Sequence, residues 1–207
     1  VQGSNKRYCN AIMFAGEDYK VLVCLSGGVE SSALVQHGVR NGYNVECIHA
    51  TWDNKTQYEH YQARKIADHY EVPYSNIIMN AEEFNSKTRP DIQVKDAPRW
   101  GAALLLTAPV DHYKEIWFGS FLGESAPGAT TPAGAEIMLR SVGCEATICS
   151  PLYQMKKIDQ WRMLDKEVKE LVTSCNRIRD ELTLAQGPCG DCEKCKEWEL
   201  HKIVRDA

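Results

Sequence analysis

The sequence lacks long hydrophobic runs, an excess of positive charge and any spacing of its six histidines that suits a metal ion. Crossing a bilayer takes about 20 consecutive apolar residues in a helix, so we expect no membrane span. The net charge is −4 and the isoelectric point about 5.9, whereas general nucleic-acid-binding domains are usually basic. We therefore predict no membrane association and no stable binding of nucleic acid.

The chain has 207 residues, of which 43% are hydrophobic and 25% charged. These values are typical of a globular domain with a substantial core. No linker-like stretch divides the sequence strongly. We predict a main domain over residues 1–170 and a small region over residues 171–207 that packs on it.

Nine cysteines are present, and their odd number argues against a framework of disulfides. Cys24 and Cys47 lie in short apolar segments that suit buried strands, where a thiol behaves as a small apolar side chain. This use of cysteine is typical of a reducing compartment, so we predict a cytoplasmic protein.

Two well-known phosphate-binding patterns are also missing: the sequence contains neither G-x-x-x-x-G-K-[ST] nor G-x-G-x-x-G. In their place, residues 21–32 read VLVCLSGGVESS. The apolar run, the two glycines and a capping serine predict a strand, a tight turn and a helix. Backbone N–H groups at such a turn form an anion site, although an ordinary strand–helix turn has the same pattern. The candidate phosphate-binding residues are Leu25, Ser26, Gly27, Gly28, Val29, Glu30, Ser31 and Ser32.

Short apolar runs alternate with amphipathic segments along most of the chain. This alternation predicts an α/β fold with a doubly wound, mostly parallel sheet, in which ligands bind at the carboxyl ends of the strands. The expected strands are 21–25, 45–50, 75–79, 114–118 and a short extended segment at 148–152, and the expected helices are 29–41, 56–70, 99–108 and 155–171.

The C-terminal region carries a C-x-x-C-x-x-C pattern with a fourth cysteine upstream. The four residues are Cys175, Cys189, Cys192 and Cys195. Four closely spaced thiolates suit a structural zinc ion. The same spacing also occurs in iron–sulfur proteins, and a disulfide pair is a further alternative.

The S-G-G-V-E-S-S loop resembles the SGG-x-D-S loop of the PP-loop ATP pyrophosphatases, with Glu30 in place of the usual aspartate. Together with the four cysteines, it makes residues 20–205 similar to the 7-cyano-7-deazaguanine synthases, a zinc-containing family within that class. Glu59, Arg99 and the Pro-Leu…Lys-like segment from Pro151 to Lys157 also resemble family features.

The resemblance implies an enzyme that uses ATP, Mg²⁺ and Zn²⁺. It would adenylate the carboxylate of 7-carboxy-7-deazaguanine and convert it with ammonia to an amide or a nitrile. It also implies a homodimer. The catalytic candidates that it suggests are Ser26, Arg99 and either Lys156 or Lys157, with Glu30 and Asp53 as weaker candidates for Mg²⁺.

Two segments depart from the family. Residues 52–56 read WDNKT where the family has Tyr-Asn-Gln-Arg-His, and residues 123–134 replace its Asp-Cys-Arg substrate segment. The acceptor substrate therefore stays open. A PP-loop enzyme that modifies tRNA and a nucleotide-binding module without catalysis are the alternatives.

Overall fold

We describe the fold from a computed structural model of the chain. The described residues are 19–51, 54–78, 112–120, 136–137, 139–141, 143–172, 189–192 and 195–196. Several predictions lie outside them: Asp53, Arg99, Cys175, the helix over 99–108 and the loop over 123–134. Among the described helices, none is long and apolar enough to cross a membrane.

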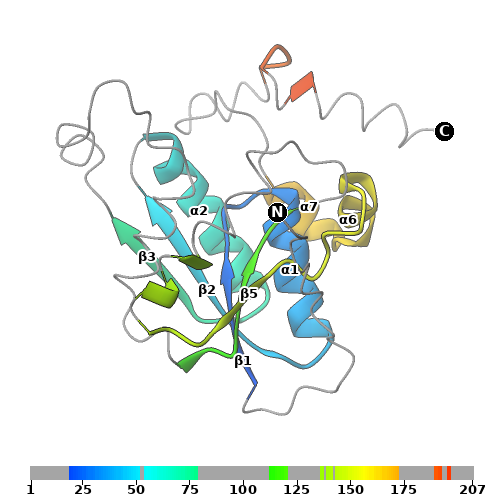
Figure 1. Cartoon of the computed structure of the whole chain (residues 1–207). Helices are drawn as coiled ribbons and strands as arrows, with labels where there is room; N and C mark the ends of the chain where they lie inside the picture. Colours follow the sequence, from blue (N-terminus) through cyan, green and yellow to red (C-terminus); the bar gives the residue numbers. More distant parts are fainter. Residues whose placement is uncertain are drawn as a thin grey trace, which may run out of the picture.

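Five parallel strands form one sheet in the order β3-β2-β1-β4-β5 (Figure 1). The chain moves outward from β1 through β2 to β3, and β4 then lies on the other side of β1. Ligands bind in such sheets where the strand order reverses, here at the carboxyl ends of β1 and β4. The strands are β1 (Lys20–Cys24), β2 (Asn44–Thr51), β3 (Tyr74–Ile78), β4 (Glu115–Phe118) and β5 (Thr147–Cys149).

Both faces of the sheet are buried, as the continuous apolar strands predict. On one face, Val21 and Val23 of β1 pack with Trp117 of β4 and with the helices α1, α2, α6 and α7. On the other face, Leu22 and Cys24 pack with apolar residues between 139 and 148. The helices of the first face are α1 (Val29–Arg40), α2 (Asn54–His69), α6 (Lys157–Met163) and α7 (Lys166–Leu171). The predicted doubly wound α/β fold is confirmed, with strand ends shifted by at most three residues.

The single helix predicted over 155–171 is wrong, because the chain breaks there into α6 and α7. Leu164 and Asp165 have extended backbone, and the carbonyl of Met163 and the N–H of Asp165 need other partners. The fully buried amide of Gln36 in α1 supplies them: its Nε2 donates to the Met163 carbonyl, and its Oε1 accepts from the Asp165 N–H at 2.8 Å. One side chain from α1 therefore replaces the helical hydrogen bonds at the break.

Candidate functional site

The loop between β1 and α1 has the strand–turn–helix form that the sequence predicts. Gly27 has a φ of +79°, a value that favours glycine. Gly28, not a serine, occupies the N-cap position of α1, and no side chain caps the helix there. The expectation of a capping serine is therefore wrong. Gly28 adds no side chain of its own over the helix N-terminus, which suits an anionic ligand.

The three serines of the loop are held close together but have different exposures. Ser32 is fully buried, and its hydroxyl donates to the Gly28 carbonyl at 2.7 Å. The Oγ atoms of Ser26 and Ser31 lie 3.1 Å apart, and the Ser26 N–H donates to Ser31 Oγ at 3.2 Å. Ser26 is half-buried, so its hydroxyl is the best placed of the three to reach a ligand. Ser32 instead fixes the shape of the turn.

Both backbone polar groups of Leu25, which precedes the serine–glycine turn, are hydrogen-bonded to residues of β2. The Leu25 N–H donates to the Ile48 carbonyl at 2.8 Å. The Leu25 carbonyl lies 2.8 Å from Nδ1 of the buried His49. Because a carbonyl oxygen can only accept a hydrogen bond, Nδ1 of His49 carries the proton and donates it. Leu25 and Val29 are themselves fully buried, and only their backbone atoms could meet a ligand.

The end of β4 lies directly against the first turn of α1. A Cβ atom at Gly119 would lie 2.7 Å from the Ser31 nitrogen and 2.9 Å from the Glu30 carbonyl carbon. Atoms cannot remain that close, so glycine is what permits this approach. Gly119 brings the two structural elements together at the point where the strand order reverses.

A lysine ammonium reaches the same helix terminus from α6. Lys157 Nζ lies 2.9 Å from Glu30 Oε1, and the exposed fractions of the two side chains are 3% and 17%. Lys156 is exposed and forms the N-cap of α6. Of the two lysines that the sequence offered, the structure places Lys157 beside the loop.

The loop ends of β4 and β5 are joined by a short polar network. Ser120 Oγ donates to Ser150 Oγ at 2.7 Å. The fully buried Gln160 donates from Nε2 to the Ser120 carbonyl at 2.8 Å and to the Leu152 carbonyl at 3.1 Å, while its Oε1 has no partner among the described residues. Gln160 lies one turn after Lys157 in α6, so this network fixes the helix that carries the lysine.

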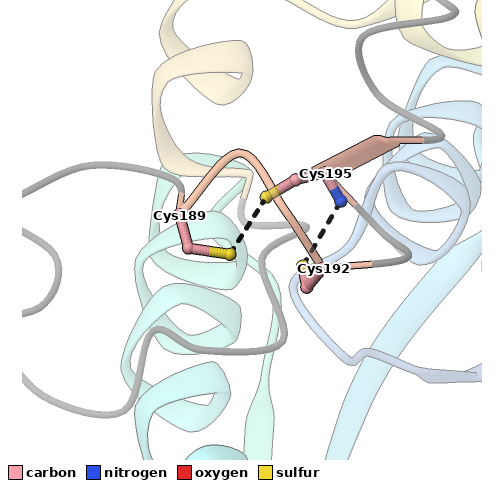
Figure 2. A group of neighbouring side chains, drawn as sticks. All are labelled: Cys189, Cys192 and Cys195. Atoms are coloured by element: carbon pink, nitrogen blue, oxygen red, sulfur yellow. Dashed lines mark hydrogen bonds between the residues drawn. The ribbon is translucent and has the colours of Figure 1, made fainter.

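Three cysteine thiols converge in the C-terminal region (Figure 2). The Sγ atoms of Cys189, Cys192 and Cys195 all lie within 4.8 Å of one another, and those of Cys189 and Cys195 are 3.9 Å apart. The Cys195 N–H donates to Cys192 Sγ at 3.4 Å, a contact that stabilises a thiolate. Tetrahedral zinc with Zn–S bonds of 2.3 Å separates its sulfurs by about 3.8 Å, so the group can hold a metal ion.

Two cysteines on the strands β1 and β2 are unsuited to nucleophilic chemistry. Cys24 and Cys47 are almost completely buried on adjacent strands. Burial, and then the neighbouring Cys47, raise the pKa of the Cys24 thiol; burial, and then Glu46, raise the pKa of the Cys47 thiol. Both remain neutral thiols at physiological pH.

The structure thus gathers Ser26, the N-terminus of α1 and Lys157 at one point. The three described cysteines form a separate group. The sequence analysis missed three contributors: Gly119, Gln160 and the pairing of Glu30 with Lys157. A signal existed for the first, because Gly119-Ser120 directly follows a predicted strand whose carboxyl end belongs at the ligand edge.

Comparison with known proteins agrees with this geometry. Residues 20–98, which include the whole loop, match the family described as Queuosine biosynthesis protein QueC. No curated protein matches the chain. Among solved structures, the fold is similar to NMN synthetase from Francisella tularensis, with a TM-score of 0.56 and 17% identity over 87% of this chain and 82% of that one.

A second similar structure is the U34-tRNA thiolase NcsA from Methanococcus maripaludis with its [4Fe-4S] cluster. Its TM-score is 0.50, with 13% identity over 92% of this chain and 67% of that one. At these identities the likeness shows the fold alone. The family match, the loop geometry and the fold together support a PP-loop ATP pyrophosphatase. The chain is thus similar to the QueC family over residues 20–98 and shares its fold with PP-loop proteins.

Proposed function

We propose that the chain is an ATP-dependent carbon–nitrogen ligase that acts on 7-carboxy-7-deazaguanine, with ammonia as the second substrate. The observation that carries the proposal is the place of Lys157, whose ammonium lies at the uncapped N-terminus of α1. The match of residues 20–98 to the QueC family supports the choice of acceptor.

The fit of ATP phosphates to these residues rests on the backbone. Gly27 and Gly28 carry no side chain over the turn, and Gly119 keeps β4 against the helix start without obstructing it. Ser26 adds a hydroxyl, and Lys157 adds a positive charge. A pyrophosphate held there would meet N–H donors, the helix dipole and a cation, which together stabilise negative charge.

In the proposed reaction, a carboxylate oxygen of the substrate attacks the α-phosphorus of ATP, and the bond to the bridging oxygen breaks. Pyrophosphate leaves with the bonding electrons, and Lys157 and the loop N–H groups stabilise its charge. Ammonia then attacks the acyl carbon and AMP leaves, which gives the amide. A second adenylation of the amide oxygen followed by loss of AMP gives the nitrile.

Two groups from outside the chain belong to this proposal. Mg²⁺ would neutralise phosphate charge, and Glu30 offers it a carboxylate beside the loop. Zn²⁺ would bind Cys189, Cys192 and Cys195 as a structural ion, because closed thiolate sites hold structure and leave no open position for catalysis. Cys175 remains the predicted fourth ligand.

A tRNA-modifying activity is less well supported. Sulfur transfer by a cysteine nucleophile needs a thiolate, and burial keeps Cys24 and Cys47 protonated. The net charge of −4 also argues against a tRNA-binding surface.

The direct test is to incubate the protein with Mg-ATP, ammonium and 7-carboxy-7-deazaguanine, and to follow AMP and the product mass. AMP together with an amide or nitrile product is the expected result. Nucleotide binding without AMP that depends on the acid would refute the ligase and favour a non-catalytic module. AMP formation with a different carboxylic acid would refute the acceptor alone.

A further inference from the structure

The middle of α2 lies between the phosphate loop and the cysteine group. On the loop side, a Cβ atom at Gly27 would meet the Glu59 carbonyl oxygen at 3.3 Å, the Ala63 nitrogen at 3.4 Å and Gln62 Cβ at 3.4 Å. The backbone of α2 therefore lies beside Gly27, the residue of the loop with a positive φ, with little more than the space of a Cβ atom between them. A shift of α2 along this contact would move the turn.

On the other side, α2 meets the cysteine group through Tyr58. The buried Tyr58 packs with Cys195, and Cys192 lies against the same pair. The exposed fractions of Tyr58 and Cys195 are both 4%. Among the described residues, Tyr58 is thus the apolar contact between a candidate metal ligand and the helix.

One hydrogen bond within α2 links the contact with Cys195 to the contact with the phosphate loop. Gln62 is 5% exposed, and its Nε2 donates to the Tyr58 hydroxyl at 2.5 Å. The same Gln62 supplies the Cβ that lies against Gly27. Cys195, Tyr58, Gln62 and Gly27 therefore lie one after another between the thiols and the phosphate loop.

We propose that Tyr58 and Gln62 are positioning residues that transmit metal binding at the cysteine group to the phosphate loop. A metal ion fixes Cys195, Cys195 fixes the Tyr58 ring, and the Gln62–Tyr58 hydrogen bond fixes the part of α2 that supports Gly27. The inference rests on the proposed function only in that the loop must bind a nucleotide. It does not depend on which acid is activated.

Such a link is a coupling free energy, and it must act in both directions. We expect removal of Zn²⁺ by a chelator to weaken the binding of Mg²⁺ with a non-hydrolysable ATP analogue by about fivefold, at the lower end of the range for coupled sites. The ATP analogue should strengthen Zn²⁺ binding by the same factor. Calorimetry measures the first quantity, and competition with a chromogenic chelator measures the second.

Tyr58→Phe keeps the ring against Cys195 but removes the hydroxyl that Gln62 needs, and Gln62→Leu removes the amide. In both variants we expect the metal effect on nucleotide affinity to fall below about twofold. The matched control is Tyr61→Phe, because Tyr61 lies on the same helix but is 54% exposed; it should keep the full effect.

The Zn²⁺-loaded variants provide a second comparison that does not require the metal-free chain to remain folded. Loaded Tyr58→Phe should bind the ATP analogue about fivefold more weakly than loaded Tyr61→Phe. Equal nucleotide affinity in these two loaded variants, or wild-type affinity that is unchanged by metal, would overturn the link while leaving the proposed function intact. A loaded wild-type protein that binds no nucleotide would overturn both.

Discussion

The contact between Gly119 and the first turn of α1 makes a specific prediction for Gly119→Ala. The added methyl would lie 2.7–2.9 Å from backbone and Cβ atoms of Glu30 and Ser31. To restore an ordinary contact of 3.4 Å, β4 and α1 must separate by about 0.7 Å. Backbone atoms cannot relieve the clash by a change of rotamer, as the end of a side chain can. We therefore expect a cost at the upper end of overpacking, about 3 kcal/mol.

A displacement of this size also matters for binding, because misplacing reacting groups by about 1 Å can cost 100-fold in rate. We expect Gly119→Ala to lower the melting temperature by about 9 °C and to weaken binding of a Mg²⁺–ATP analogue at least about tenfold. Thermal unfolding and titration calorimetry measure the two effects separately.

Gly38→Ala is the matched control, since it makes the same chemical change in a tightly packed position far along α1. Its Cβ would lie 2.6 Å from Val45 Cγ2 and 3.2 Å from Trp117 Cζ3, which are side-chain atoms. The better helix propensity of alanine offsets about 1 kcal/mol of that clash. This variant should lose stability but keep nucleotide affinity. Equal losses of affinity in both variants would show that Gly119 acts only through stability, and the reasoning would fail.

Three further predictions concern polar groups that are buried or half-buried. Lys157→Met should slow AMP formation about 100-fold, as removal of a charge-stabilising donor does. Lys156→Met should retain most activity because that side chain is exposed. Similar losses in both variants would contradict the assignment of the phosphate-binding role to Lys157. Gln36→Leu should lower the free energy of unfolding by about 3 kcal/mol, because the backbone groups at the α6–α7 break lose their partner; a denaturation midpoint equal to wild type would refute that role. Burial lowers the pKa of His37, and burial followed by Arg64 lowers the pKa of His60. The unfolded chain then binds more protons below about pH 6.5, so stability should fall as the pH decreases from 7 to 5.5. Over this pH range, the melting temperature of His60→Phe should fall less than that of the wild type. An identical fall in both proteins would show that His60 does not contribute to the pH dependence.

Much of the fold could be predicted because the local signals agree with one another. The apolar runs before Ser26 and before Gly119 have the length and composition of buried parallel strands, and both were found. The loop was predictable from its two glycines, since few other residues allow so tight a turn with no side chain of its own over the backbone. Periodicity locates such elements because it depends only on residues close in the chain.

The failures came from contacts between residues far apart in the sequence. The break between α6 and α7 depends on Gln36, which lies about 130 positions earlier. The choice of Lys157 over Lys156 depends on the rotation of α6 about its axis, which Gln160 sets through the Ser120 and Leu152 carbonyls. Neither contact leaves a signal in the local pattern of apolar and polar residues.

The double attachment of Leu25 to β2 has a consequence for the entropy of binding. Because both backbone groups of Leu25 are held, and Ser32 already hydrogen-bonds to Gly28, only Ser26 and Gly27 lie between fixed points. Ordering a backbone residue costs about 1–2 kcal/mol of conformational entropy. In this loop most of that entropy is already lost when the chain folds, before a ligand binds. A phosphate entering the loop therefore loses little of its interaction energy to ordering the backbone.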